Sequence, residues 1–399
     1  MQNKPGAGSK KIDPNGRADF IINEHRRDIK FGLFGNISGK ALHHKKIDFG
    51  EVVCVIPRQH ANNQIILRSF WNSNDYLSCS SYHEDFVVGG IVDIRLYQYP
   101  EECKQAQNWI MRSVHAVDDI LKNIPYPDPT TQMQIDPVPV IYYLPEYVYI
   151  TENDDIKVGV WDEKEQTWTT EPIEELQYDK LARKLEFSTR QFGPIAYLQS
   201  RCTDYPYKRW KIRCVEAETA ILDVETKRVT LTFELGRNYI KLIEKTDPEF
   251  KDILDKPMSP GELFLELQKC GINLMPVDDD AKLGGIHLKD RQAEENAIID
   301  VATGLRSFAF RSCKWNKSIN GENVVVKIRE NLEFDREYFE DHEPDWRYVM
   351  WWPNKCAFVR CSDDAETCDT RLPNGHETHA LLSLAIKGYF SEEAVDRCH

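Results

Sequence analysis

Short runs of β-branched and aromatic residues, separated by turn residues, dominate the beginning of the chain. They occupy residues 29–34, 51–56, 64–71 and 86–96. Such runs are typical of antiparallel strands rather than of βαβ units. They predict a β-sandwich module over residues 29–124, entered after a basic flexible arm at residues 1–28.

The apolar residues then change to a helical period. Between residues 101 and 124 they recur at spacings of three and four, which places them on one helical face. Prolines follow and end this predicted helix, so residues 125–139 are expected to form a Pro-rich linker. The apolar residues are Trp109, Ile110, Val114, Val117, Ile120, Leu121 and Ile124, and the prolines are Pro125, Pro127, Pro129, Pro137 and Pro139.

The strand pattern resumes after the linker. The polar run from Asp223 to Val229 is typical of a hairpin between two further strands. We therefore expect a second β-sandwich over residues 140–257. Its predicted strands are residues 140–150, 156–161, 184–189, 195–199, 210–215, 219–224 and 228–235.

The rest of the chain mixes helices and strands. Ser259-Pro-Gly-Glu262 matches a capping box, which starts a helix that Gly271 closes. Residues 258–399 are predicted to form an α+β region, so the whole chain is expected to be mainly β, with two tandem antiparallel β-sandwich modules before that region. Its further helices are predicted at residues 290–310 and 377–390, and its strands at residues 323–329, 346–352 and 355–360.

Composition limits the classes of protein. The chain has 399 residues and a formal net charge of −14, and no apolar run approaches the roughly 20 residues of a membrane-spanning helix. The N-terminus lacks the apolar core of a secretory signal. We therefore expect a cytoplasmic protein without membrane contact. The 11 cysteines show no repeated spacing, so no disulfide framework is predicted.

Charge is unevenly distributed along the sequence. Residues 1–46 carry ten Lys or Arg against four Asp or Glu, a net charge of +6, whereas residues 320–399 carry nine against 17, a net charge of −8. The basic arm is either solvated or bound to an acidic protein surface. Nucleic acid is not expected as a partner, because no motif for reading RNA or DNA accompanies the arm. The candidate partner-binding residues of this region are Lys10, Lys11, Arg17, Arg26, Arg27, Lys45 and Lys46.

Motifs for catalysis are missing from the sequence. Neither a phosphate loop nor GxGxxG nor GxSxG occurs, so we expect no enzyme activity and no cofactor. The C-terminal set Cys356, Cys361, Cys368, His376 and His379 lacks the tight ligand spacing of a zinc site, and no metal is expected.

An acidic segment and three tryptophans lie close together near the C-terminus. Residues 333–345 hold seven carboxylates without the order of an EF-hand, which indicates a solvated loop or a site for a basic partner. Trp346, Trp351 and Trp352 follow. Trp351 and Trp352 are both candidate partner-binding residues, but neighbouring strand residues point opposite ways, so at least one is expected in the core.

Two consecutive segments resemble a known kind of β-sandwich. Residues 160–170, with Trp-Asp at their start and Trp-Thr-Thr at their end, and residues 185–199 resemble the end of the GAIN and ZU5-like subdomains. Autoproteolytic members of that group use a His-Leu-Ser/Thr tripeptide. The matching positions here are Gln191, Phe192 and Gly193, so the resemblance implies a sandwich that does not cleave itself.

A second resemblance covers about residues 29–330. It is carried by Phe31-Gly-Leu-Phe-Gly-Asn-Ile, Val87-Val-Gly-Gly-Ile-Val-Asp and Ser259-Pro-Gly-Glu-Leu-Phe, together with residues 192–199 and 289–295. With these motifs the chain resembles the cancer-susceptibility-candidate-one family, a group of axonemal inner-arm dynein intermediate-chain proteins. The resemblance implies a non-catalytic structural or regulatory accessory subunit in the axoneme of motile cilia or flagella. It also implies contacts with dynein heavy and intermediate chains and with tubulin.

Two other functions stay open. One is a cytosolic signalling adaptor that uses the ZU5-like sandwich to hold its partners. The other is a hydrolase whose site is assembled from distant residues, for instance His83, Glu84 and Asp85 with Cys54.

Overall fold

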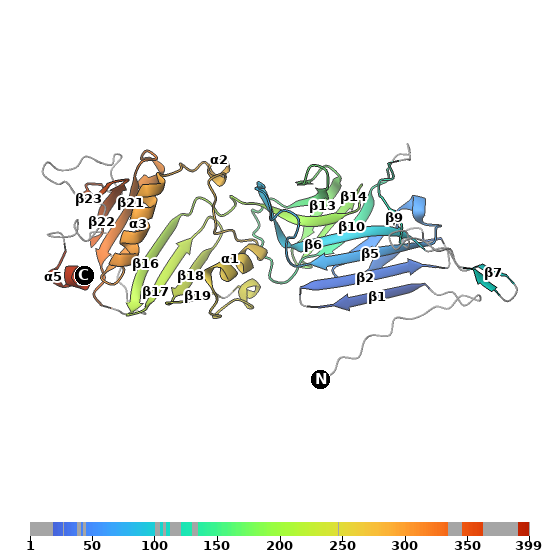
Figure 1. Ribbon diagram of the computed structural model, residues 1–399, viewed down its shortest axis with the longest axis horizontal. Coiled ribbons are helices and arrows are strands. Elements are labelled where there is room, and N and C mark those ends of the chain that lie inside the picture. Colours follow the sequence, from blue (N-terminus) through green and yellow to red (C-terminus); the bar gives the residue numbers. More distant parts are fainter. Residues whose placement is uncertain are drawn as a thin grey trace, which may run out of the picture. The chain divides into compact units, whose positions relative to one another are not determined.

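The computed structural model divides the chain into two compact units (Figure 1). The first comprises Met1–Ser200 with Lys269–Gly271, and the second comprises Arg201–Gln268 with Ile272–His399. Both are built mainly from antiparallel strands, which confirms the predicted mainly β class. The structure describes residues 19–26, 28–37, 41–42, 45–99, 104–106, 109–111, 121–129, 135–245, 247–333, 345–361 and 390–398.

The first unit is a sandwich of two antiparallel sheets. One sheet has the order β1-β2-β5-β6-β15-β11-β12, with β9 added beside β6, and the other has the order β13-β14-β10-β4-β3. The strands of the larger sheet are β1 (Phe20–His25), β2 (Ile29–Asn36), β5 (Ile65–Asn72), β6 (Asp85–Gln98), β9 (Asn123–Ile124), β11 (Lys157–Asp162), β12 (Thr167–Thr169) and β15 (Pro194–Ser200). Those of the smaller are β3 (Lys46–Asp48), β4 (Val52–Val55), β10 (Val138–Tyr143), β13 (Ile173–Asp179) and β14 (Lys184–Thr189), and a short 3-10 helix, η1 (Arg58–His60), joins β4 to β5.

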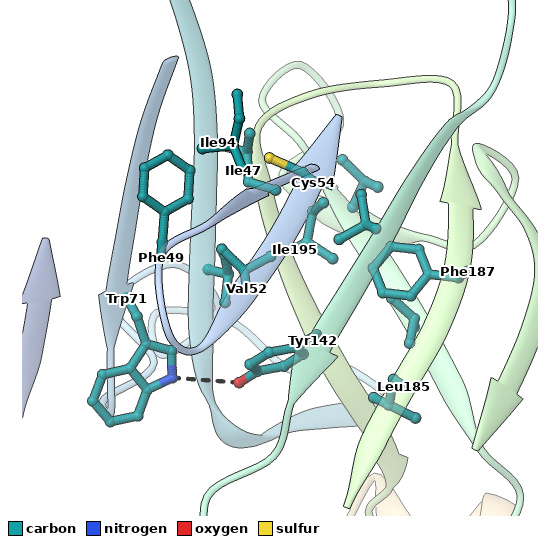
Figure 2. Packing of buried hydrophobic residues seen from close by; sticks show 14 of the residues in the cluster. Ile47, Phe49, Val52, Cys54, Trp71, Ile94, Tyr142, Leu185, Phe187 and Ile195 are labelled. Carbon is teal, nitrogen blue, oxygen red and sulfur yellow. Dashed lines mark hydrogen bonds between the residues drawn. The ribbon is translucent and has the colours of Figure 1, made fainter. Parts of the chain in front are cut away.

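The inward faces of the two sheets form one hydrophobic core, part of which Figure 2 shows. Alternate strand residues such as Ile65 and Leu67 of β5 and Val140 and Tyr142 of β10 point into it, as the period of a strand requires. At one place the core is polar. Trp71 Nε1 donates to the main-chain oxygen of Gly89 at 3.2 Å, and Tyr142 Oη donates to the same oxygen at 3.1 Å. Two buried donors from opposite sheets thus share one acceptor on β6.

That acceptor is accessible because β6 bulges at two glycines. The pairing of β6 with β15 shifts between Ala196, opposite Ile91, and Tyr197, opposite Val88, which leaves Gly89 and Gly90 without direct partners on β15. Gly90 has a φ of +96°, and a Cβ there would lie 2.4 Å from the main-chain oxygen of Asn72. Only glycine satisfies both conditions.

The second unit is organised around an eight-stranded sheet of order β19-β18-β17-β16-β20-β21-β22-β23. Its strands are β16 (Arg209–Glu216), β17 (Thr219–Glu225), β18 (Thr230–Leu235), β19 (Ile240–Ile243), β20 (Phe308–Ser312), β21 (Val324–Glu330), β22 (Arg347–Trp352) and β23 (Lys355–Val359). The helices are α1 (Pro260–Lys269), α2 (Asp280–Gly284), α3 (Arg291–Gly304) and α5 (Glu392–Cys398), with 3-10 turns η3 (Pro248–Phe250) and η4 (Lys314–Lys317).

Helix α3 covers one face of this sheet, over β21 and β22 (Figure 1). Ala297 of the helix packs in a cluster with Phe308, Phe310, Val326 and other buried residues of the strands. The helix begins where Asp290 accepts from the main-chain nitrogen of Ala293 at 3.0 Å. The predicted capping box of α1 is present as well, because Ser259 Oγ accepts from the Glu262 nitrogen at 3.3 Å and Glu262 Oε2 accepts from the Ser259 nitrogen at 3.0 Å.

Buried ion pairs fix the loops at the start of the second unit. Asp204 is almost fully buried, and both of its carboxylate oxygens accept from Arg228, at 3.0 and 2.9 Å. Arg201 donates to the equally buried Asp280 at 3.0 Å. Since removal of one partner from such a pair leaves an uncompensated charge, these contacts strongly constrain the paths of residues 201–208 and 273–280.

A short segment after α1 completes the first unit. The main-chain nitrogen of Tyr149 donates to the oxygen of Cys270 at 2.8 Å, and Gln199 Nε2 donates to the oxygen of Gly271 at 2.9 Å. The chain therefore passes between the units at residues 200/201, 268/269 and 271/272.

The predicted domain boundaries are wrong in the middle of the chain. Strands β10 to β15, expected at the start of a second sandwich over residues 140–257, complete the first sandwich instead, because β10 pairs with β4 and β15 pairs with β6. Strands β16 to β19, expected in the same sandwich, join the sheet of the predicted α+β region 258–399. The two segments compared with GAIN and ZU5-like subdomains contribute to β11, β12 and β15 of the larger sheet and to β14 of the smaller one.

The helix predicted at residues 101–124 is also wrong where the structure describes it. Residues Lys104–Ala106 and Trp109–Met111 form the hairpin β7–β8, and β9 pairs with β6. The aromatic and β-branched residues Trp109 and Ile110 favour a strand, and hairpin pairing satisfies their backbone groups. The described residues of the predicted linker, 125–129 and 135–139, belong to the first unit, where Tyr126 is buried against Phe192 and its hydroxyl donates to the main-chain oxygen of Asp136.

The ends of the chain differ from the predictions as far as they are described. Phe20–His25 of the predicted flexible arm 1–28 forms β1 along the edge of the larger sheet, where its backbone pairs with β2. The predicted second helix ends at Gly304, and β20 follows within the expected range. Residues 1–18 of the arm and residues 377–389 of the predicted last helix lie outside the described residues. No described helix is long and apolar enough to cross a membrane.

We expect Gly90→Ala to destabilise the first unit by about 2 kcal/mol or more, because the new Cβ meets backbone and the positive φ strains an alanine. Urea unfolding of the full chain, followed by far-UV circular dichroism, measures this. Gly261→Ala is the matched control, because Gly261 lies in α1 with nothing within 4 Å of an added Cβ. The control is expected to be neutral or slightly stabilising. Equal stability of both variants would contradict the role given to the bulge.

Candidate functional site

The face of the second sheet opposite α3 carries positive charge. Along β21, Val326 and Ile328 point to the cluster under α3, so Val325, Lys327 and Arg329 point to the other face. On β20 the same alternation places Arg311 on that other face. Charged and apolar residues thus share the face of β20 and β21 that lies opposite α3.

Strand register brings these cations into one row. Lys211 of β16 is opposite Arg311 of β20, which is opposite Lys327 of β21, which in turn is opposite Tyr348 of β22. Directly opposed residues of like charge destabilise a sheet. The row therefore concentrates positively charged side chains on one face of the sheet, and the groups around them must offset their repulsion.

Aromatic rings support the two central cations of the row. The guanidinium of Arg311 lies 4.4 Å from the ring centroid of Trp346, and Lys327 Nζ lies 5.2 Å from that of Tyr348. Both side chains are deep, with exposed fractions of 6% for Arg311 and 3% for Lys327. Cation–π contacts of this kind hold a charged group in place when it is largely removed from water.

A cavity of about 580 Å³ opens beside the row. Its lining includes seven Lys or Arg side chains and one carboxylate, Glu294. We call this cavity the cationic pocket. Arg311 and Lys327 form its deep part, and the exposed residues Lys208, Arg209, Lys314 and Lys317 lie around it. Arg209 Nη2 is 3.7 Å from a carboxylate oxygen of Glu225, which lies outside the lining.

Burial changes the proton affinity of two groups in the cationic pocket. Partial burial lowers the pKa of Lys289, with Glu294 acting in the opposite direction, and Lys289 Nζ donates to the main-chain oxygen of Asn320 at 3.1 Å. Burial also raises the pKa of Glu294, and the nearby Asp278 adds to this effect. Each shift is in the direction that favours the uncharged form of its own group.

The lining of the cationic pocket combines positively charged side chains with aromatic and apolar ones. Guanidinium and ammonium groups converge on a concave space whose remaining wall includes Tyr207, Trp210 and Ile286. Arginine recognises carboxylate and phosphate oxygens with paired hydrogen bonds, and lysine adds a point charge.

Sequence reasoning missed this site. Its cations lie between residues 208 and 327, far apart in sequence, and only the pairing of β16, β20 and β21 brings them together. One signal was available, because Lys327 and Arg329 alternate with apolar residues inside a strand where solvent exposure does not explain them.

Among the described residues of the predicted basic region, Arg26 and Lys45 lie apart from each other. Arg26 is exposed just beyond β1, whereas Lys45 is exposed near Phe34, whose ring centroid is 4.9 Å from Lys45 Nζ. Phe34 is opposite Ile21, so about five residues of strand, roughly 17 Å, separate the two cations. Lys46 is exposed at the start of β3. Lys10, Lys11, Arg17 and Arg27 lie outside the described residues.

The two adjacent tryptophans have different surroundings. Trp351 is fully buried, with an exposed fraction of 0%, and its Nε1 donates to Asp300 Oδ2 of α3 at 2.8 Å. The prediction that Trp351 contributes to a partner surface is therefore wrong, since the residue belongs to the core under α3. Trp352 is half-buried on the opposite side, with Lys355 Nζ 5.0 Å from its ring centroid. It stays a candidate contact residue.

The C-terminal cysteines and the acidic segment give no site among the described residues. Cys356 is buried on β23, and Cys361 is disulfide-bonded, which the lack of a predicted disulfide framework did not anticipate. Within the described ranges no group of His, Cys, Asp and Glu could hold a metal ion. Cys368, His376, His379 and residues 334–344 lie outside these ranges.

The turn that contains Gly193 directly precedes β15. Gln191, Phe192 and Gly193 line a cavity of about 480 Å³ in the first unit, and none of its lining residues is Ser, Thr, Cys or His. The nearby hydroxyl of Thr189 donates to the main-chain oxygen of Gln191 at 2.8 Å. It is therefore engaged in holding the turn.

The residues of the hydrolase alternative do not form one site. Cys54 lies in the sandwich core, and burial raises the pKa of its thiol to about 12. His83 lies before β6, where its Nε2 is 2.9 Å from Ser81 Oγ and its ring contacts Trp161 edge-on. Asp85 pairs with Lys157 at 3.4 Å. The thiol is therefore neither ionised at neutral pH nor open to solvent.

Comparison with known proteins identifies relatives of this chain. It is 26% identical over 318 residues to dynein axonemal intermediate chain 7 of Homo sapiens, covering 78% of this chain and 43% of that protein. Against the protein of the same name from Danio rerio it is 24% identical over 326 residues, covering 78% and 44%. A homolog from Ciona intestinalis is 22% identical over 275 residues, covering 60% and 36%.

These relatives confirm the predicted resemblance to axonemal dynein intermediate-chain proteins. The chain spans less than half the length of the relatives named above. No protein-family model matches it.

We expect cysteine labelling at pH 8 to separate the exposed from the buried thiols. N-ethylmaleimide reacts with the thiolate, so exposed Cys79 should be modified within minutes, whereas Cys54 and Cys356, each with a pKa raised to about 12 by burial, should stay unmodified until urea unfolds the chain. Peptide mass spectrometry reads out each site. Labelling of native Cys54 as fast as Cys79 would contradict its placement and favour the hydrolase alternative.

Proposed function

We propose that this chain is a non-catalytic structural or regulatory accessory subunit of an axonemal inner-arm dynein in motile cilia or flagella. The observation that carries this proposal is the similarity over 78% of the chain to proteins named dynein axonemal intermediate chain 7. The partners are other dynein subunits and, through basic residues, the microtubule. The chain acts at the axoneme.

The architecture supports a role in assembly. Two units built on large antiparallel sheets offer extended, rigid surfaces to partners. Long-range pairings such as β10 with β4 and β15 with β6 make each sheet a single cooperative body. A rigid body of this kind holds partners at fixed positions, which is what an accessory subunit contributes to a motor complex.

The first test is recovery of the tagged full chain from a ciliated cell. We expect the chain to locate to the axoneme, and affinity purification after salt extraction to enrich dynein heavy and intermediate chains at least about tenfold over an unrelated tagged cytoplasmic protein. Mass spectrometry measures the enrichment. A chain that stays in the cell body and purifies with signalling proteins would contradict the proposal and favour the adaptor alternative.

The second test concerns the microtubule. Charge attraction between basic residues and an acidic filament is screened by salt, so the full chain should pellet with microtubules at about 50 mM salt and much less at about 300 mM. We expect the triple variant Lys10→Gln, Lys11→Gln and Arg17→Gln to reduce pelleting at low salt severalfold. Equal pelleting of the unaltered chain at both salt concentrations would rule out electrostatic attachment.

A matched variant controls for the loss of net charge. Lys251→Gln, Lys256→Gln and Lys282→Gln removes three exposed positive charges from the second unit, more than 200 residues after the N-terminal region in the sequence. It should pellet like the unaltered chain. An equal loss in both triple variants would mean that overall charge, and not the N-terminal region, governs binding.

A further inference from the structure

We propose that the open edge of β1 binds a second copy of this chain, so that two first units join through one continuous antiparallel sheet. The two copies are related by a two-fold axis at Ile21. This self-association goes beyond the proposed dynein role and does not depend on it. The backbone groups at the edge, the exposed isoleucines of β1 and the order of its residues support the pairing.

Strand β1 (Phe20–His25) is the outermost strand of the larger sheet (Figure 1). Among the described residues its strand partner is β2, which it meets from Phe20 opposite Gly35 to His25 opposite Lys30. An edge strand presents a row of backbone groups that another chain can use for pairing. β1 therefore offers a template of six consecutive residues.

The hairpin between β1 and β2 shows which backbone groups point outward. The main-chain nitrogen of Arg26 donates to the oxygen of Ile29 at 2.8 Å, so the pair that closes the hairpin is hydrogen-bonded. In an antiparallel ladder, bonded pairs alternate with pairs that are not bonded. Every second residue of β1 therefore turns its N–H and C=O to the open edge. These residues are Ile21, Asn23 and His25.

Several other sheet edges carry features that oppose such pairing. β3 and β12 have three residues each, and the pairing of β13 with β14 has a register shift. The edge of β19 is covered, because Ile240 and Met258 exchange two main-chain hydrogen bonds. Short strands, bulges, covering segments, lysine and proline are the usual protection of an edge. β1 has no lysine, proline or register shift.

The side chains of β1 are apolar where the strand begins. Ile21 is 42% exposed and Ile22 is 48% exposed, on opposite faces of the sheet. Ile22 is opposite Leu33 of β2, and it shares its face with Phe20, whose ring lies over Gly35. A further strand at this edge would cover apolar surface on both faces of the sheet, which favours association.

The order of these residues suits a copy of the same strand. With the axis at Ile21, this residue lies opposite its own copy, and Phe20 lies opposite Ile22 of the second copy. All these cross-strand pairs are apolar, and such pairs stabilise a sheet. The outward backbone groups of Ile21 also meet their own copies, as a bonded pair on the axis requires. An axis at Asn23 would instead place Ile22 opposite Glu24.

Sedimentation velocity of the full chain tests the association. Two paired strands of six residues form a contact that is small beside the roughly 1,200–2,000 Å² of a standard interface, so we expect a reversible dimer with a Kd of about 1–100 μM. The chain should change from monomer to dimer between about 0.5 and 200 μM. A monomer at about 200 μM would overturn the proposal. Growth into larger oligomers would do so as well, because a two-fold pair closes on itself.

A charge at the axis tests the location of the contact. Ile21→Lys places a positive charge opposite its own copy and should weaken the dimer at least about tenfold. Ile298→Lys is the matched control, because it makes the same change in α3 at a residue that is 68% exposed, and it should stay within about twofold. Circular dichroism establishes that both variants are folded. An equal loss in both would indicate unspecific apolar association and contradict the proposal.

Disulfide cross-linking tests the register. Ile21→Cys brings two introduced thiols into one bonded pair with Cα atoms about 5.5 Å apart, which a disulfide can span. Glu24→Cys is the control, because its two copies would lie about 20 Å apart along the strands. Both variants also carry Cys79→Ser, which removes an exposed native thiol.

After mild oxidation with diamide, we expect at least about tenfold more covalent dimer from Ile21→Cys than from Glu24→Cys. Electrophoresis without reductant measures the yield, and peptide mass spectrometry identifies the linked position. Equal cross-linking at both positions would exclude the two-fold pairing at Ile21. None of these results alters the recovery of the chain with dynein, so the two proposals fail separately.

Discussion

The first unit depends on one buried polar contact between its two sheets. Trp71 and Tyr142 come from opposite sheets, and both direct their polar atoms to the main-chain oxygen of Gly89. Buried donors are costly unless they are satisfied, so the sheets can pack closely here only in the register that provides this acceptor. The bulge at Gly89 and Gly90 turns the acceptor toward the core. A local irregularity of β6 thereby fixes the alignment of the whole sandwich.

The two faces of the sheet in the second unit differ in their polarity. One face of its sheet is apolar and covered by α3, while the other face carries Arg311 and Lys327 in direct opposition. Aromatic rings and the surrounding fold must offset the repulsion between these two groups. Positively charged side chains are in this way accommodated within a sheet whose other face forms an apolar core.

Many strands and helix ends could be predicted from short stretches of sequence. The main error concerned which strands pair with one another across long distances in the sequence. The strand at residues 323–329, the strand at residues 355–360 and the capping box at Ser259 follow from side-chain alternation and turn chemistry, and they are present. The grouping of strands into domains depends on pairings such as Val140 with Cys54, across more than 80 residues, which no local pattern encodes. The cationic pocket was missed for the same reason, because its residues are neighbours only across strands. Trp351 was misjudged because its burial depends on α3.

The return of Lys269–Gly271 to the first unit has a consequence for how the protein is made. A ribosome releases the chain from its N-terminus, and strand β15 is complete at Ser200. The hydrogen bonds that Cys270 and Gly271 provide to Tyr149 and Gln199 arrive only about seventy residues later. During synthesis the first unit therefore exists for some time with these groups open to water. Its last hydrogen bonds form only after residues 201–268 of the second unit have left the ribosome. The first unit can thus complete its folding only after synthesis of the second unit has begun.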